Sequence, residues 1–474
     1  MPRVVLISTY DMGRSPFGLA SPAAWLRAAG CEVRCCDLAV EPLDEASVRA
    51  ADLIAFHLPM HTATRLALGV IPRVRALAPS ARLAAYGLYA VTNAAVLREQ
   101  GVTDAISGEY EAALVRLAKE PCVAGGAGDI AIAGEAPGPR VPTSRRAITV
   151  LDRLDFIVPD RSDLPPIERF ARLRIGAEEK RVGATEASRG CKHRCRHCPV
   201  VPVYDGMFRV VPRDVVLADI RQQVAAGAQH ITFGDPDFFN GIGHALPLAR
   251  AFRAEFPDVT YDVTIKVEHL LRHAEAMPVL RDTGCAFVVT AVEAFDDGIL
   301  DALEKGHTRA DFERALAMAR EVGLTLQPTF VAFTPWTTLA GYGGMIEALA
   351  TLGLIDHVAP VQLSLRLLIP AGSRLLERDD IRALVEEFDA RGLVHRWHHP
   401  DPRVDALQRA VQAEVGRRAA AGEDRATIFR AVAEIAEDFG AGSPRLRAAL
   451  DAYGAGAESE RRAPVPYLTE PWYC

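Results

Sequence analysis

The chain has 474 residues, of which 49% are hydrophobic and 24% charged, and its formal net charge is −7 at pH 7. This length predicts two or three globular domains, and an acidic chain without a basic patch is not expected to bind nucleic acid. The N-terminal apolar run is too short for a secretory signal, and no stretch approaches the roughly 20 apolar residues of a membrane span. Nine cysteines are too few for a disulfide scaffold. We therefore expect a cytoplasmic protein with no membrane partner, whose cysteines serve metal or redox chemistry.

The first 120 residues alternate short apolar runs with helical patterns. The predicted strands are residues 4–8, 32–38, 53–58, 82–88 and 105–109, and the helices between them include 22–29, 62–77 and 93–100. Five strands alternating with helices predict an α/β fold with a doubly wound parallel sheet, whose ligands bind at the carboxyl ends of the strands. The first strand is not followed by GxGxxG, so a dinucleotide site has little support.

Residues 121–180 are predicted to be a linker, because glycine, alanine and proline dominate residues 120–145. A second alternation fills residues 181–378, with predicted strands at 182–186, 229–234, 260–267, 286–292, 325–333 and 361–368. Six strand–helix units predict a partial (β/α)6 barrel with its active site at the carboxyl ends of the strands. Residues 379–462 are predicted to be helical, beginning with a helix at 379–391, and residues 463–474 form a tail that ends in cysteine.

The loop after the first barrel strand reads Cys-Lys-His-Arg-Cys-Arg-His-Cys over residues 191–198. A structural zinc site or a fully ligated iron–sulfur cube takes four protein ligands, whereas Cys191, Cys195 and Cys198 supply three. Three thiolates leave one iron of a [4Fe–4S] cluster open for chemistry. The alternative is a zinc site that His193 and His197 complete, but His193 lies too close between the cysteines for the usual paired spacing. We expect both histidines to pack against the cluster.

A CxxxCxxC loop that opens six strand–helix units resembles the radical S-adenosylmethionine (SAM) superfamily. The resemblance implies that the open iron binds the amino and carboxylate groups of SAM, and that one electron from the cluster breaks a carbon–sulfur bond. It also implies an electron donor such as flavodoxin or ferredoxin. The protein would bind and orient the cofactor and exclude water, since the cofactor carries the difficult step.

Three further positions fit this resemblance. The turn Gly-Asp-Pro after the second barrel strand places Gly234 and Asp235 where relatives carry a Gly-Gly-Glu-like turn for the amino group of SAM, although Gly-Asp-Pro also suits a plain turn. Glu293, at the end of the fourth strand, matches the acid that meets the ribose hydroxyls. Arg366, in the sixth strand, could pair with a cofactor carboxylate through its fork geometry, or with Glu293 or another acid of the protein.

The sheet domain before the barrel resembles the cobalamin-binding-domain class of the superfamily. Gly-Glu-Tyr-Glu at 108–111 looks like the Gly-Glu-x-Glu turn of this class, and Pro-Asp-Arg-Ser-Asp-Leu-Pro-Pro at 159–166 looks like its bridge to the barrel. The Asp-x-His-x-x-Gly motif that supplies a histidine to cobalt is absent, and Tyr-Asp-Met-Gly at 10–13 stands near its place. His57 and His61 flank a strand end and are interpreted as ordinary surface residues. Cobalamin therefore stays an open alternative.

The tail ends in Glu-Pro-Trp-Tyr-Cys at 470–474 and resembles a small radical SAM subgroup named for a Cys-Cys-Ala-Glu-Pro or Cys-selenocysteine-Ala-Glu-Pro ending. A UGA codon read as a stop after Cys474 would remove a selenocysteine and the Ala-Glu-Pro that follows it. The resemblance implies a catalytic Cys474, because a thiolate beside a selenolate could bind a soft metalloid or reduce an intermediate. The plain alternative is a frayed terminus with an incidental cysteine.

These observations predict a radical SAM enzyme that delivers a radical or an alkyl group to a small molecule. A related subgroup with a different cysteine-rich tail is associated with carbon–arsenic bond formation through the aminocarboxypropyl part of SAM. By that analogy, a metalloid or a natural-product precursor is a candidate substrate. The second enzyme hypothesis is cobalamin-dependent methyl transfer, and the non-enzymatic hypothesis is a structural zinc- or iron-binding scaffold.

Overall fold

The computed structural model describes residues 1–120, 146–459 and 465–469, and for residues 454–459 it describes the backbone alone. The chain divides into two compact units, Met1–Phe170 with Ala390–Leu393, and Ala171–Asp389 with Val394–Cys474. The predicted catalytic Cys474 lies outside the described residues. Among the described residues, no helix is long and apolar enough to cross a lipid bilayer.

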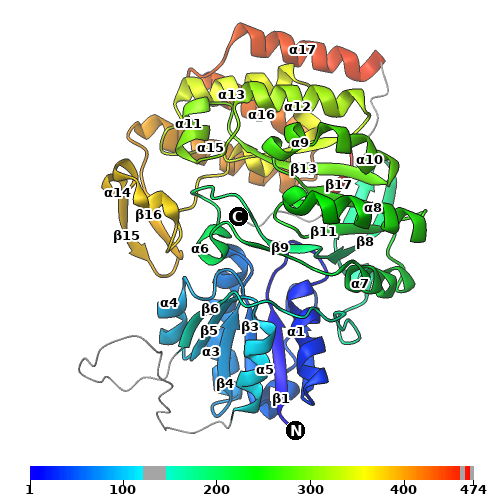
Figure 1. The fold of residues 1–474 in the computed structure, drawn as a ribbon. Helices are drawn as coiled ribbons and strands as arrows, with labels where there is room; N and C mark the ends of the chain where they lie inside the picture. Colours follow the sequence, from blue (N-terminus) through cyan, green and yellow to red (C-terminus); the bar gives the residue numbers. More distant parts are fainter. Residues whose placement is uncertain (121–145, 460–464, 470–474) are drawn as a thin grey trace. The chain divides into compact units, whose positions relative to one another are not determined.

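A parallel sheet forms the centre of the first unit (Figure 1). Its strands in the described residues are β1 (Arg3–Ser8), β2 (Glu32–Asp37), β3 (Leu53–His57), β4 (Arg82–Tyr86), β5 (Asp104–Gly108) and β6 (Arg146–Val150). Their order is β2-β1-β3-β4-β5-β6, and every neighbouring pair is parallel. Strand β6 lies within the segment predicted to be a linker. As an edge strand it is largely exposed, so it lacks the buried apolar run that marks the other five.

Helices cover both faces of this sheet: α1 (Phe17–Ala28), α2 (Glu45–Ala50), α3 (His61–Leu77), α4 (Ala94–Glu99) and α5 (Glu111–Lys119). Leu114 of α5 joins the apolar cluster on one face, together with Leu6 of β1. Ile71 of α3 joins the cluster on the other face, together with Ile7, the next residue of β1. Successive side chains of one strand are thus buried on opposite faces, which confirms the predicted doubly wound sheet.

A curled sheet forms the centre of the second unit (Figure 1). In spatial order its described strands are β14 (Leu326–Phe330), β13 (Cys285–Glu293), β12 (Thr260–Thr264), β11 (His230–Phe233), β8 (Glu178–Thr185), β7 (Arg172–Ile175) and β17 (Tyr467–Leu468). The run from β8 to β14 is parallel, whereas β7 and β17 are antiparallel additions beyond β8. Strand–helix units around a curled parallel sheet confirm the partial barrel. The unit begins before the predicted residue 181 because the antiparallel β7 precedes the parallel run.

Helices follow the barrel strands and continue beyond them. They are α6 (Val201–Tyr204), α7 (Arg213–Ala225), α8 (Ile242–Glu255), α9 (Val267–Arg272), α10 (Met277–Asp282), α11 (Asp297–Ala302), α12 (Arg309–Glu321), α13 (Leu339–Thr351), α15 (Pro402–Ala420), α16 (Arg425–Asp438) and α17 (Pro444–Ser459). The local sequence sets several of their starts. Thr308 begins α12 with a capping box that Asp311 completes, and Asp296 accepts a hydrogen bond from the Ile299 N–H at the start of α11.

The predicted sixth barrel strand at 361–368 is not a strand. The segment Pro360–Leu363 is the 3-10 helix η5, and a single parallel bridge joins Phe333 to Arg366. The side chain of Gln362 accepts the backbone N–H of Phe330 at 3.0 Å, where a sixth strand would otherwise supply a carbonyl. Pro328 within β14 also lacks a backbone donor, which an edge strand tolerates.

The predicted helix at 379–391 ends early. Helix α14 (Asp379–Leu384) is followed by an antiparallel pair, β15 (Val385–Asp389) and β16 (Val394–Trp397). The charged residues of β15 match a helical surface pattern, but a long-range contact decides the structure. Trp397 is buried in an apolar cluster with Leu367, and its indole N–H donates to the Leu367 carbonyl at 2.9 Å. Tertiary packing therefore overrides the local pattern.

Gly108 is a backbone constraint on the first unit that a substitution can test. It has φ 81°, and a Cβ at this position would lie 2.0 Å from the carbonyl oxygen of Val150 in β6. We expect Gly108→Ala to lower the unfolding free energy by about 2–4 kcal/mol, through left-handed strain and steric overlap. Gly69→Ala is the matched control because its Cβ meets nothing within 4 Å in α3. It should be neutral or stabilise by up to about 1 kcal/mol. Urea unfolding measured by circular dichroism compares the two, and equal stability would contradict the role of Gly108.

Candidate active site

The three-cysteine loop follows β8 and the short strand β9 (Ser188–Gly190), which pairs with β10 (Phe208–Val210). Cys191 and Cys195 are buried, Cys198 is half-buried, and none of the three is in a disulfide. Burial raises the pKa of Cys198 to about 12, and the neighbouring thiols Cys195 and Cys191 add to that rise. Cys198 is therefore protonated in the metal-free chain, and binding a metal to it must release that proton.

Hydrogen bonds from the backbone N–H groups of this loop hold it in place. The side-chain oxygen of Asn240, which is buried after β11, accepts the backbone N–H of Lys192 at 3.1 Å and lies 3.8 Å from the Cys191 sulfur. On the other side, the N–H of Arg196 donates to the carbonyl of Leu303 at 3.0 Å. The three sulfur atoms are thus presented by a loop fixed at both ends to the barrel.

Gly234 and Asp235 lie at the carboxyl end of β11, as the sequence predicts for them. The N–H of Gly234 donates to the carbonyl of Thr185 at 2.7 Å, which extends the ladder with β8. The buried carboxylate of Asp235 accepts the N–H of Ala187 at 2.9 Å and the hydroxyl of Ser188 at 2.5 Å. Burial raises the pKa of Asp235 to about 6. In this structure Asp235 fixes the segment that leads into the cysteine loop.

Glu293 ends β13 in a left-handed conformation, with φ 73°, where the register with β14 shifts. Its Oε1 lies 3.3 Å from both the Lys305 ammonium and the Nε2 of His197 in the cysteine loop. Burial alone would raise the pKa of Glu293, but Lys305 and His197 outweigh it and lower the pKa to about 2. Both contacts use Oε1, so Oε2 can accept a hydrogen bond from a ligand hydroxyl.

Arg366 is engaged by the protein itself. Its guanidinium donates to the Asp405 carboxylate at 2.6 Å and to the Trp397 carbonyl at 2.5 Å, and it stacks on the Trp397 ring at 3.5 Å. The sequence left two partners open for Arg366, a cofactor carboxylate or an acid of the protein. The structure shows an acid of the protein, which is Asp405 and not Glu293. The fork of Arg366 thus ties the end of the barrel to α15.

Sequence reasoning missed several residues of this site. Lys305, a buried cation, follows α11 and carries no motif. Asn240 lies in the 3-10 helix Phe238–Gly241, in a segment whose residue spacing predicts no ligand. His269 on α9 and Asp237 come within 2.8 Å of each other, and Asp237 lies 3.4 Å from His193. The sequence around Lys305 does not show that this lysine is buried. Once its burial is known, a paired acid is expected, because a lysine is rarely fully buried without one.

Comparison with known proteins identifies the barrel. Residues 185–335 match the Radical SAM superfamily. These residues form a radical SAM domain. The resemblance of the cysteine loop to the radical SAM superfamily is thus confirmed. A radical SAM domain implies a [4Fe–4S] cluster and SAM. The donor set described above, three unpaired thiols in one fixed loop, fits such a cluster.

The relatives extend over both units of the chain. Hopanoid C-3 methylase from Methylococcus capsulatus is 25% identical over 353 residues, which cover 71% of this chain and 64% of that protein, so the chain spans less than two thirds of its length. The structure of the cobalamin-dependent radical enzyme OxsB has a TM-score of 0.68 at 14% identity, covering 97% of this chain and 71% of that one. The methyltransferase TsrM from Kitasatospora setae has a TM-score of 0.59 at 16% identity, covering 96% and 99%. These two solved structures share the fold of this chain.

The ion pair of Glu293 and Lys305 yields a stability prediction. Lys305→Met leaves a buried carboxylate with only His197 as its partner, so the unfolding free energy should fall by about 3 kcal/mol in urea at pH 7. The contribution of Glu293 should be complete above its ordinary pKa of 4.5 and be lost as the pH falls toward 2. The double variant Glu293→Gln/Lys305→Met removes both charges and should recover most of the loss. A single variant as stable as the native chain would contradict the pairing.

Proposed function

We propose that the chain is a radical SAM enzyme that delivers a radical or an alkyl group derived from SAM to a small molecule. Cys191, Cys195 and Cys198 would hold the [4Fe–4S] cluster, and the observation that carries this proposal is a single fixed loop with three buried or half-buried thiols. When bound, the cluster supplies one electron that cleaves a carbon–sulfur bond of SAM. An external reductant such as flavodoxin or ferredoxin would provide that electron.

The remaining residues would bind and orient the cofactor. We assign Oε2 of Glu293 to the ribose hydroxyls, because the ion pairs of Oε1 hold the carboxylate ionised and rigid. Gly234 would face the amino group of SAM at the end of β11, and Asp235 would act through the loop that it fixes. Arg366 has the weakest support as a cofactor contact, since Asp405 and Trp397 occupy its fork.

Cobalamin-dependent methyl transfer is the second candidate. The strand order 2-1-3-4-5 within the first sheet is the flavodoxin-like order that binds ligands at a switch point, and OxsB and TsrM share the fold. The residues at that edge fit a cobalt site poorly. The first loop has no histidine, and the ring of His57 packs 5.2 Å from the Tyr86 ring and fills the space beside Gly18. We therefore assign no residue of this chain to cobalt.

A cofactor analysis tests the proposal. Anaerobically purified chain should contain about four iron and four sulfide per chain and should consume SAM after dithionite is added. Cys195→Ala should lose both properties, whereas Cys31→Ala, a substitution in the core of the first unit, should keep both. A colourless protein that does not consume SAM would instead support the scaffold hypothesis.

The same preparation separates the two enzyme candidates. After incubation with hydroxocobalamin and gel filtration, retained stoichiometric cobalamin with methylated product would support methyl transfer. Without retained cobalamin, mass spectrometry should detect either 5′-deoxyadenosine or the product left when the aminocarboxypropyl group is removed.

We also propose that Cys474 acts at the carboxyl ends of the barrel strands, where a metalloid or natural-product precursor would meet it. The support comes from β17, which is antiparallel to β7 and so runs in the direction of β8. Thr469 lies opposite Arg172, which pairs with Arg181, and Thr185 ends β8 roughly 13 Å further along. Residues 470–474 can span about 16 Å when extended, which is enough to reach that level.

Labelling tests the position of Cys474. If it lies beside the cofactor, SAM bound to the cluster-loaded enzyme should slow the alkylation of Cys474 by iodoacetamide at least several-fold, as measured by peptide mass spectrometry. The tail cysteine of the Cys195→Ala variant, which lacks the cluster, should be alkylated at the same rate with and without SAM. Equal rates in the loaded enzyme would place Cys474 elsewhere.

A further inference from the structure

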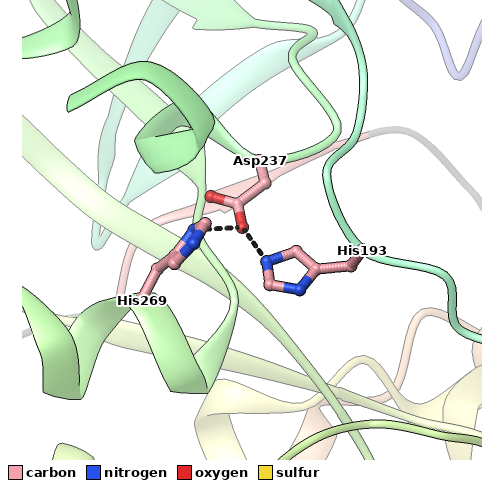
Figure 2. Close-up of side chains that lie close together, drawn as sticks. All are labelled: His193, Asp237 and His269. Atoms are coloured by element: carbon pink, nitrogen blue, oxygen red, sulfur yellow. Dashed lines mark ion pairs between the residues drawn. The ribbon is translucent and has the colours of Figure 1, made fainter. Parts of the chain in front are cut away.

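Three side chains outside the cofactor contacts converge beside the cysteine loop. His193 belongs to the loop, Asp237 precedes the 3-10 helix η2 (Phe238–Gly241), and His269 lies on α9. Figure 2 shows both imidazole rings directed at one oxygen of Asp237. That oxygen, Oδ2, lies 2.8 Å from Nδ1 of His269 and 3.4 Å from Nε2 of His193. One ligand atom from each residue lies within 4.8 Å of the other two.

These three atoms are buried, and none has a hydrogen-bond partner with acceptable geometry. The side chains of Asp237 and His269 are only 2% and 3% exposed. A buried polar atom without a partner is costly, so proteins rarely retain one without a function. The other carboxylate oxygen of Asp237 accepts the N–H of Phe239 at 3.0 Å, which fixes the carboxylate with Oδ2 toward the histidines.

A second His–Asp pair in the same barrel shows what a hydrogen-bonded pair looks like here. His230 is fully buried, its Nε2 lies 2.8 Å from Asp262 and its Nδ1 lies 2.8 Å from the hydroxyl of Thr260, both with hydrogen-bond geometry. Both nitrogens of His230 therefore have a partner. The three ligand atoms of the triad instead lie within 4.8 Å of one another without such hydrogen bonds.

We propose that His193, Asp237 and His269 form a mononuclear site for a divalent transition metal, zinc or ferrous iron, separate from the iron–sulfur cluster. Two imidazoles and one carboxylate form a borderline ligand set that suits both metals and leaves coordination positions open. Hard cations such as magnesium prefer oxygen ligands and would be disfavoured.

The surroundings supply an orienting group for this site. Nδ1 of His193 lies 3.5 Å from the Glu268 carboxylate and 3.1 Å from the Lys266 ammonium. The Lys266 ammonium can only donate, so Nδ1 of His193 accepts from it in this structure. A metal on Nε2 requires the proton of the neutral imidazole to lie on Nδ1, which would then donate to Glu268 in place of accepting from Lys266. Lys266 pairs with Glu268 at 3.7 Å, which offsets its charge next to the cation.

Metal analysis of the cluster-loaded full chain tests this site, with zinc chloride as the probe followed by desalting. We expect about one zinc per chain in addition to the cluster iron, bound by nitrogen and oxygen at about 2.0–2.1 Å with no sulfur at about 2.3 Å by X-ray absorption. His269→Gln should reduce the zinc at least tenfold while the cluster iron and its absorbance are unchanged. His273→Gln, which alters a neighbouring histidine outside the triad, should keep both metals.

Three outcomes would overturn the proposal. They are no zinc above background in the native chain, sulfur ligation of the zinc, and undiminished zinc in His269→Gln. If His269→Gln also loses the cluster, Asp237→Asn provides the second variant, and retained zinc in a folded Asp237→Asn chain would again contradict the site. Because the readout is metal content, failure of the radical SAM proposal would appear separately as missing cluster iron or absent SAM cleavage.

Discussion

The ion-paired carboxylate of Glu293 is the interaction on which the candidate active site depends. Two unfavourable features meet at this residue, a left-handed backbone that costs about 1–2 kcal/mol and a charge that is largely removed from water. Lys305 and His197 offset both, and each comes from a different segment. Because His197 lies between two of the cysteines in sequence, the ion pair that stabilises Glu293 also fixes the cysteine loop to the end of β13.

The opposite side of the loop is fixed in a different way. Asn240 accepts a hydrogen bond from the backbone beside Cys191, and Asp235 accepts two from the segment just before it. Both residues follow β11, which is separated from β13 by β12 alone. The loop is therefore fastened at two points across three neighbouring strands. These contacts hold the loop in place before a metal binds.

Sequence patterns predicted the parts of the fold that are buried on both faces. Strands of the first sheet such as β3 are short apolar runs because helices cover both faces of that sheet. The edge strand β6 carries no such mark, which explains why it was assigned to a linker. Residues 361–368 do alternate apolar and polar side chains like a strand, yet only Arg366 forms a β-bridge, to Phe333. The spacing of the cysteine loop depends on local chemistry alone and was readable directly.

Contacts between distant segments could not be predicted in this way. The partner of Arg366 is Asp405 on α15, and the partner of Glu293 is Lys305 beyond the following helix. Both acids and both bases have ordinary patterns in their own segments, so only the folded barrel shows which charges meet. The same reason hid His269 and Asp237, whose approach depends on the ends of two strands lying side by side.

Residues 465–469 contact both edges of the barrel sheet. A parallel sheet that does not close leaves unpaired backbone groups at β14 and at its other edge, which natural proteins cover or shorten. Here β17 pairs with β7 at one edge, and the side chain of Gln327 in β14 donates to the carbonyl of Pro466, just before β17. Arg425 of α16 also lies 4.5 Å above the ring of Tyr467. The segment that covers one edge is therefore bonded to the other, so the need to satisfy both sheet edges holds residues 465–469 against the barrel.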